Sequence, residues 1–308
     1  MKLHEILGIK YPLIQGGMAN IATGEFAASV SNTGALGMIG AGGMTADMLR
    51  EQIQICKQHT NMPFGVNLML MNPDTDKMAE IVIEEQVPVV TTGAGNPGKY
   101  MKQWKDAGIK VFPVVASVGL ARRMERLGAD GVIAEGCESG GHVGETTTMV
   151  LVPQVADAVN IPVIAAGGIA SGRQMLAVEV LGACGVQVGT CLLSTTECPI
   201  HENYKQAVRN ARDTHITVMG RIAGTPVRVI KNTMVREYIA REKEGATLME
   251  LEHYTLGSLR RAVKEGDIET GSIMAGQTAA MIHDECSLSE RMETLFREYE
   301  TVLKGLCQ

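Results

Sequence analysis

Short apolar segments recur along the first two thirds of the chain, each bounded by Gly, Pro, Asn or Asp. They are rich in Val and Ile and do not alternate strictly with polar residues, which is typical of strands buried on both faces of a parallel sheet. The segments predicted as strands are 12–15, 35–39, 63–69, 87–92, 110–116, 130–135, 161–167 and 185–190.

Amphipathic segments lie between these strands, with apolar residues three or four positions apart, as in helices with one buried face. The predicted helices are 45–59, 76–86, 97–108, 119–128, 150–160 and 172–182. Eight strands that alternate with helices every ~20–25 residues predict an α/β fold, the TIM (β/α)8 barrel. A doubly wound open sheet is the alternative, but the strand count matches a closed barrel better.

The alternation of strands and helices ends after Thr190. Residues 196–270 are more polar and rich in charges, so we expect a small helical insertion or lid after the eighth strand. The chain then returns to the barrel and ends in a helix, where Ser287 and Glu290 fit a capping box. The predicted domains are therefore a barrel over 1–195 and 271–308 and a small domain over 196–270.

The charge and hydropathy of the chain argue against nucleic-acid-binding, membrane and secreted proteins. The formal net charge of −6 and the pI near 5.7 argue against nucleic acid as a partner, although an acidic carrier could still dock on a local basic patch. No apolar run reaches the ~18 residues of a membrane span, and the N-terminus lacks the apolar core of a signal peptide, so we expect a cytoplasmic protein with no membrane partner.

The cysteines are odd in number and form no CxxC pair, so we expect reduced thiols and no metal site. They are Cys56, Cys137, Cys184, Cys191, Cys198, Cys286 and Cys307.

Glycines follow the predicted strands seven and eight, at the end of the barrel where active sites lie. Gly167 and Gly168 would expose backbone N–H groups, and Gly189 and Thr190 add another N–H group and a hydroxyl. One such loop could simply be a tight turn, but both loops in this order predict a phosphate cradle. Glycine also lines the other loops, where the backbone can lie against a flat ring. No GxGxxG motif follows the first strand, which argues against a Rossmann dinucleotide site, so the pattern favours FMN.

His142 is the outstanding titratable residue, because it follows strand six in a loop with Gly140 and Gly141. An imidazole there suits transfer of a proton to or from carbon near neutral pH. The other histidines are interpreted as structural or surface residues: His4, His59, His201, His215, His253 and His283.

The motifs QGGMA, PFGVNLML, VVTTGAGNPGKYM, VIAEGCESGGHVG, PVIAAGGIASG, VQVGT, VRVIKN and GSIMAGQ occur in this order along the whole chain. The chain thereby closely resembles the flavin-type enoyl-acyl-carrier-protein (enoyl-ACP) reductases, enoyl-ACP reductase II. GGHxG, AAGGI and QVGT also occur in nitronate monooxygenases of the same superfamily, whereas VTTGAGNPxKYM and GSxMAGQ look more specific to the reductase.

The resemblance implies an FMN barrel that passes a hydride from NADH or NADPH to a trans-2-enoyl thioester on acyl carrier protein, in bacterial fatty-acid elongation. It also implies a homodimer that is stimulated by a monovalent cation. The alternative is a nitronate monooxygenase, in which the same histidine acts as a base and the reduced flavin reacts with oxygen.

The resemblance makes His142 the active-site histidine. The expected cofactor-binding residues are Gly17, Met18, Asn67, Glu135, Gly140, Gly141, Ala166, Gly167, Gly168, Gly189, Thr190, Met274 and Gln277. Cys191 departs from the family, whose reductases usually carry Arg after QVGT. Cys137 invites a second hypothesis, a nucleophile as in the related IMP dehydrogenase barrels, but the longer loop of those enzymes is missing. Glu138 could orient the loop, contact the flavin or face solvent.

Overall fold

Eight parallel strands form the central sheet of the computed structural model, which describes residues 1–306 and leaves Cys307 outside the described range. The strand order is β1-β9-β8-β6-β5-β4-β3-β2, and a bridge between Ile14 and Leu36 joins the two ends of the sheet. The predicted TIM (β/α)8 barrel and its eight strands are confirmed. The strands are β1 (Leu13–Gln15), β2 (Gly37–Gly40), β3 (Phe64–Met69), β4 (Val89–Gly93), β5 (Lys110–Val115), β6 (Val132–Glu135), β8 (Val163–Ala166) and β9 (Gly185–Val188).

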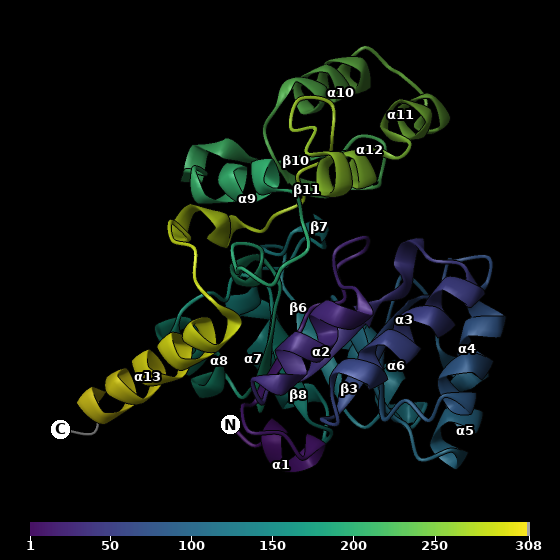
Figure 1. The fold of residues 1–308 in the computed structure, drawn as a ribbon, viewed down its shortest axis with the longest axis vertical. Helices are drawn as coiled ribbons and strands as arrows, with labels where there is room; N and C mark the ends of the chain where they lie inside the picture. The colour runs from purple at the N-terminus through teal and green to yellow at the C-terminus, as the bar shows by residue number, and fades with distance from the viewer. Residues whose placement is uncertain (307–308) are drawn as a thin grey trace.

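Helices surround the barrel (Figure 1). They are α2 (Gly24–Asn32), α3 (Ala46–His59), α4 (Thr75–Glu84), α5 (Gly98–Asp106), α6 (Val118–Arg126), α7 (Thr148–Ala158) and α8 (Gly172–Val180). All six predicted helices are present, but α2 was not predicted. Its buried face is mainly Gly, Ala and Ser, which gives little contrast between apolar and polar positions. Small residues are needed there, because a Cβ on Gly24 would lie 2.0 Å from the backbone O of Gln52 in α3.

The interior of the barrel is packed with side chains. Residues from five of the eight strands are fully buried there: Ile14, Met38, Phe112, Ile133 and Ile164. The first helix, α1 (Leu3–Leu7), closes the amino-terminal end of the barrel with Leu3 and Leu7. Figure 1 places α1 at the opposite end of the barrel from the insertion, so only the carboxyl ends of the strands face the insertion.

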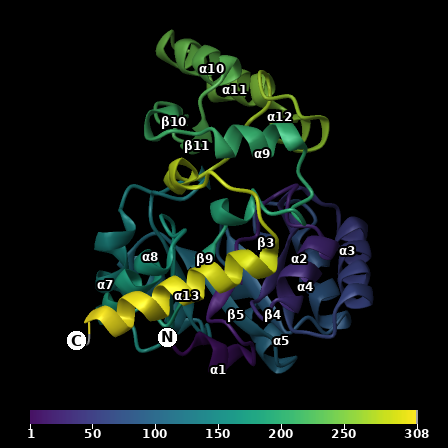
Figure 2. The ribbon, with the colours of Figure 1, turned by 60° about the vertical axis from the view of Figure 1, so that its left-hand side comes forward.

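The insertion forms a separate lobe above the barrel (Figure 2). It contains α9 (Glu202–Arg209), β10 (Ile216–Met219), β11 (Val227–Ile230), α10 (Thr233–Lys243), α11 (Leu248–Thr255) and α12 (Ser258–Arg260). The predicted helical insertion is confirmed, and a small sheet adds to it: β10, β11 and β7 (Gly141–His142) pair antiparallel. Strands of two to four residues are too short to show a period in the sequence.

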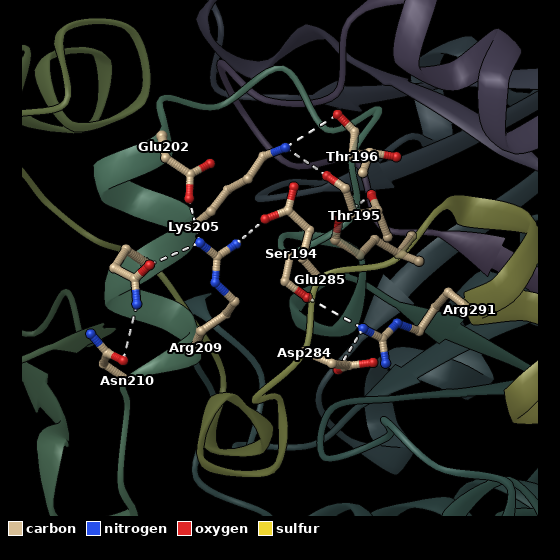
Figure 3. Close-up of polar contacts among 12 residues, drawn as sticks. Ser194, Thr195, Thr196, Glu202, Lys205, Arg209, Asn210, Asp284, Glu285 and Arg291 are labelled. Carbon is tan, nitrogen blue, oxygen red and sulfur yellow. Dashed lines mark hydrogen bonds and ion pairs between the residues drawn. The ribbon is translucent and has the colours of Figure 1, made fainter.

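The insertion has its own apolar cluster, in which Val229, Tyr238 and Leu251 are buried. Polar contacts hold the segments where the chain leaves and re-enters the barrel (Figure 3). Nζ of the buried Lys205 in α9 donates to the backbone O of Thr195 at 2.7 Å. Arg209 forms an ion pair with Glu285 at 2.6 Å. The separate apolar cluster and these polar contacts support the proposed domain boundaries, between residues 195 and 196 and between residues 270 and 271.

The last helix, α13 (Leu288–Leu306), packs along α8 and anchors the end of the chain. A Cβ on Gly172 would lie 2.1 Å from the backbone N of Tyr299, so glycine permits this close approach. The capping box is confirmed: Ser287 N donates to Glu290 Oε2 at 2.8 Å, and Glu290 N donates to Ser287 Oγ at 3.2 Å. Within residues 1–306, no helix is both long and apolar enough to cross a bilayer.

Candidate active site

Asn67 lies at the carboxyl end of β3, directly beside Thr91 of β4 in the register of the sheet. The Thr91 hydroxyl donates to Asn67 Oδ1 at 2.9 Å, and this bond orients the amide. Asn67 Nδ2 lies 3.4 Å from the backbone O of Gly17. A Cβ on Gly17 would lie 2.2 Å from Asn67 Cβ, so only glycine permits this contact. The structure therefore brings Gly17 and Asn67 together at the mouth of the barrel.

Glu135 and Ala166 form a second pair of neighbours, on β6 and β8. The Ser139 hydroxyl donates to Glu135 Oε1 at 3.2 Å. Burial raises the pKa of the Glu135 carboxyl to about 7, and the hydrogen bond from Ser139 opposes this rise only in part. Glu135 can therefore hold a proton near neutral pH and donate a hydrogen bond.

Unpaired backbone amides follow β8 and β9. The N–H groups of Gly167, Gly168, Gly189 and Thr190 donate to no acceptor within residues 1–306. Gly167 and Gly168 have φ of +88° and +73°, a left-handed backbone that favours glycine. The amides of Gly167 and Gly168 precede α8 by several residues, so this half of the cradle belongs to the loop and not to the first turn of the helix. Free N–H groups of this kind fit the predicted phosphate site.

A cavity of about 280 Å³ lies beside Gly168. Its lining includes the side chains of Gln174, Gln277 and Thr278, which can donate hydrogen bonds to an anion. Glu138 also lines it, but that carboxylate already accepts bonds from Thr148. These donors fit a phosphate group. A larger hollow of about 760 Å³ is lined wholly by insertion residues between 241 and 254 and contains none of the predicted site residues.

The segment around Met274 returns from the insertion and crosses the predicted site. The backbone N of Gly276 donates to Thr190 Oγ1 at 2.9 Å, and Gln277 N donates to the backbone O of Glu138 at 2.9 Å. A Cβ on Gly140 would lie 2.7 Å from the backbone of Ala275. This segment therefore joins the loops that follow β6 and β9.

Two methionines lie against glycines of the predicted site. A Cβ on Gly189 would lie 3.3 Å from Met18 Sδ, and one on Gly141 would lie 3.7 Å from Met274 Sδ. The two thioethers therefore place apolar, polarizable groups beside the backbone of the predicted site. The structure thus links all the predicted cofactor residues through neighbouring loops, while their roles stay a prediction.

His142 is exposed and lies in β7, which pairs with β11 of the insertion. Its ring forms no hydrogen bond within residues 1–306. The ring is therefore free to form hydrogen bonds from the loop after β6, and its role as the active-site histidine stays a prediction.

The cysteines near the site are poorly suited to act as nucleophiles. Burial raises the pKa of Cys137, and it raises the pKa of Cys191 to about 12. Cys191 is fully buried behind the cradle, so its side chain faces the core. The departure from the family at this position therefore alters the packing behind the cradle, while the free amides of Gly189 and Thr190 remain.

The sequence analysis missed two residues that support the site. The buried Arg228 donates to the backbone O of Cys137 from Nη2 at 2.7 Å. The hydroxyl of Tyr204 in α9 donates to the backbone O of Met274 at 2.7 Å. The Arg within the apolar strand VRVI was the available signal for Arg228, because a charge inside a buried strand needs a partner.

Comparisons with known proteins agree with this geometry. The nitronate monooxygenase family model matches residues 1–298. A curated protein of Staphylococcus saprophyticus, named probable nitronate monooxygenase, is 33% identical over 324 residues, which covers 90% of this chain and 91% of that protein. The structure of FabK from Thermotoga maritima superposes with a TM-score of 0.96 at 47% identity, and it covers 99% of this chain and 97% of that one.

Nitroalkane oxidase from Streptomyces ansochromogenes is also similar. It superposes with a TM-score of 0.89 at 27% identity and covers 99% of this chain and 100% of that one. The family model extends over nearly the whole barrel and insertion, and the curated relative covers 90% of the chain. On this basis the chain belongs to the nitronate monooxygenase family.

Proposed function

We propose that this protein is an FMN-dependent enoyl-ACP reductase, which reduces trans-2-enoyl thioesters with NADH or NADPH in bacterial fatty-acid elongation. The observation that carries the proposal is the 47% identity to FabK from Thermotoga maritima over nearly the full length of both chains. FabK is the flavin-type reductase whose motifs the sequence resembles. The nitroalkane oxidase is less similar, at 27% identity.

The residues at the barrel mouth fit FMN. The free amides of Gly167, Gly168, Gly189 and Thr190 would hold its phosphate, and Gly17, Met18, Asn67 and Met274 would surround its ring. When bound, FMN supplies two-electron transfer between the nicotinamide and the β-carbon of the enoyl group, in a ping-pong sequence.

In this proposal, His142 donates a proton or a hydrogen bond to the reduced substrate. Reduction at the β-carbon leaves negative charge on the α-carbon and the thioester oxygen. An imidazolium at that position lowers the barrier by donating a proton or a hydrogen bond. The exposed ring of His142, free of other hydrogen bonds within residues 1–306, suits this role.

The insertion, over 196–270, would cover the substrate as a lid. Its strand β11 pairs with the His142 strand β7, so substrate contacts and the histidine share one small sheet. Acyl carrier protein as the partner, a homodimer, a cytoplasmic location and a stimulatory monovalent cation remain parts of the proposal.

Anaerobic stopped-flow absorbance tests this function. NADH or NADPH should bleach the bound flavin, and crotonyl thioester should then restore the oxidised spectrum without oxygen. The proposal is wrong if the nicotinamides leave the flavin oxidised, or if the reduced flavin is not reoxidised by the thioester.

Nitronate monooxygenase activity is the second candidate, because the curated relative of 33% identity bears that name. Here His142 would remove a proton from the nitroalkane carbon, and a nitronate would bleach the flavin directly. The same stopped-flow experiment distinguishes the two candidate activities. If a nitronate bleached the flavin and NADH or NADPH did not, the protein would be a monooxygenase.

A further inference from the structure

Arg228 reaches from the insertion into the loop that carries His142. It lies in β11 with 6% of its surface exposed, and its guanidinium donates twice to the backbone O of Cys137, from Nε at 3.1 Å and from Nη2 at 2.7 Å. Two N–H groups on one carbonyl fix both the position and the direction of that peptide.

The same strand also holds the other end of the loop. Arg228 lies opposite Gly141 in the antiparallel pair of β11 and β7, and Val227 lies opposite His142. The backbone N of Val143 donates to the O of Pro226 at 3.1 Å. The loop is therefore tied to the insertion at residue 137 and again at 141–143, on both sides of Gly140.

Charge pairing does not account for this arginine. Within residues 1–306, Arg228 forms no ion pair with a carboxylate, and burial lowers the pKa of its guanidinium. Burying a guanidinium without a carboxylate partner costs free energy, which its hydrogen bonds to a carbonyl offset only in part. The side chain therefore contributes something other than stability. The planar guanidinium supplies two parallel donors that a lysine cannot, which points to geometry as its function.

A neighbouring arginine offers a matched contrast. Arg221, in the turn between β10 and β11, pairs with Glu145 of the same loop at 2.9 Å. Its side chain is 50% exposed and that of Glu145 is 77% exposed. Surface pairs of this kind contribute little to stability or order, so Arg221 joins the same two segments without fixing them.

We propose that Arg228 is a positioning residue: its paired bonds to the Cys137 carbonyl fix the 137–143 loop, and thereby couple the placement of the insertion to the orientation of His142. The effect on catalysis rests on the proposed function of His142. The effect on the loop does not, so the two parts can be tested separately.

Hydrogen exchange with mass spectrometry on the flavin-bound protein tests the loop. In Arg228→Gln, the amides of 137–143 should exchange on the order of 10-fold faster, while amides of α10 keep their rates. Arg221→Gln should leave both regions unchanged. Unchanged exchange of the loop in Arg228→Gln would overturn the proposal, as would an equal rise throughout the insertion, which would mean a structural role only.

Arg228→Lys keeps the inference testable if the glutamine variant does not fold. A lysine retains the cation and most of the packing but can place only one donor well on the carbonyl. It should recover part of the loop protection. Full recovery would show that charge alone holds the loop and would contradict the geometric role.

Stopped-flow kinetics with a double-mutant cycle test the coupling to His142. Arg228→Gln should slow flavin reoxidation by the enoyl thioester about 10-fold and leave flavin reduction within about 2-fold. Combined with His142→Gln, it should add no further loss, because both act through one group. Additive losses would refute the coupling. No loss in His142→Gln alone would instead refute the proposed role of the histidine, and the exchange data would still decide the loop.

Discussion

The carboxylate of Glu138 accepts the backbone N–H of Thr148 at 2.9 Å and lies 2.9 Å from the Thr148 hydroxyl. Thr148 begins α7, so a residue of the glycine loop caps a helix that starts ten residues later. The charge also faces the positive end of the helix dipole. The interpretation that Glu138 orients the loop agrees with this geometry, whereas a freely solvated side chain does not.

Glu138→Ala should therefore destabilise the protein. It leaves the first turn of α7 without its acceptor, and such losses cost about 1–3 kcal/mol. Urea denaturation followed by circular dichroism measures the change in the free energy of unfolding. Glu145→Ala is the control, because this exposed carboxylate pairs only at the surface and should cost less than about 0.5 kcal/mol. Equal stability of the two variants would refute the capping role.

Gly17→Ala should remove flavin and destabilise the barrel mouth. The new methyl group would lie 2.2 Å from Asn67 Cβ, so the loop or Asn67 must move. Overpacking of this kind costs about 1–3 kcal/mol, and the shift would disturb the proposed ring site. Flavin absorbance per protein and the melting temperature measure both effects.

The matched control for Gly17→Ala is Gly119→Ala, in α6. No atom lies within 4 Å of the Cβ that this substitution adds. It should raise stability by about 0.4–1 kcal/mol and keep the full flavin content, because alanine restricts the unfolded chain. If both variants retained flavin equally, the tight contact at Gly17 would have no bearing on the cofactor.

His142→Ala should lower the rate of flavin reoxidation by an enoyl thioester by about 10²–10⁴-fold, the usual contribution of a general acid. Flavin reduction by NADH or NADPH should change little, and so should the melting temperature, because the ring is exposed. Single-turnover stopped-flow separates the two half-reactions. His253→Ala, at an exposed position of α11, is the control. Equal rates for both variants would remove His142 from the mechanism.

The sequence was sufficient to predict the barrel, because its buried parallel strands are predominantly apolar and segments such as 87–92 and 161–167 stand out between turn residues. The phosphate cradle was predicted from Gly167 and Gly168 after β8 together with Gly189 and Thr190 after β9. Their backbone amides are unpaired within residues 1–306, which fits that prediction.

Contacts between distant segments could not be predicted in this way. The pairing of β7 with β11 joins residues about 85 apart in the chain, and two-residue strands carry no period. Arg228 acts on a backbone carbonyl, which every residue possesses, so no partner residue type marked it in the sequence. Tyr204 contacts Met274 in the same manner.

Cys137→Ala should leave turnover within about 3-fold of the unmodified enzyme. Burial raises the pKa of this thiol, so little thiolate forms near pH 7 to act as a nucleophile. Its contribution to the site is the backbone O that accepts from Arg228, and alanine keeps that group. Steady-state assays with crotonyl thioester measure the effect. A loss of more than about 100-fold with normal flavin content would revive the nucleophile hypothesis.

The raised pKa of Glu135 should make the free energy of unfolding depend on pH. Its pKa in the folded protein is raised to about 7 from an ordinary 4.5, so between these values the folded state holds a proton that the unfolded state releases. Stability therefore falls as pH rises through this window and levels off above it. Glu135→Gln removes the titration, and its stability relative to the unmodified protein should grow from pH 5 to pH 8 by at most about 3 kcal/mol.

Urea denaturation of both proteins at matched flavin content, repeated across this pH range, measures the difference. Other titrating groups are common to both proteins and cancel, which isolates the carboxyl of Glu135. Glu145→Gln, at an exposed carboxylate, should run parallel to the unmodified protein. A constant difference between Glu135→Gln and the unmodified protein would mean that Glu135 ionises normally. It would then enter the site as an anion and could not donate a hydrogen bond to the flavin near neutral pH.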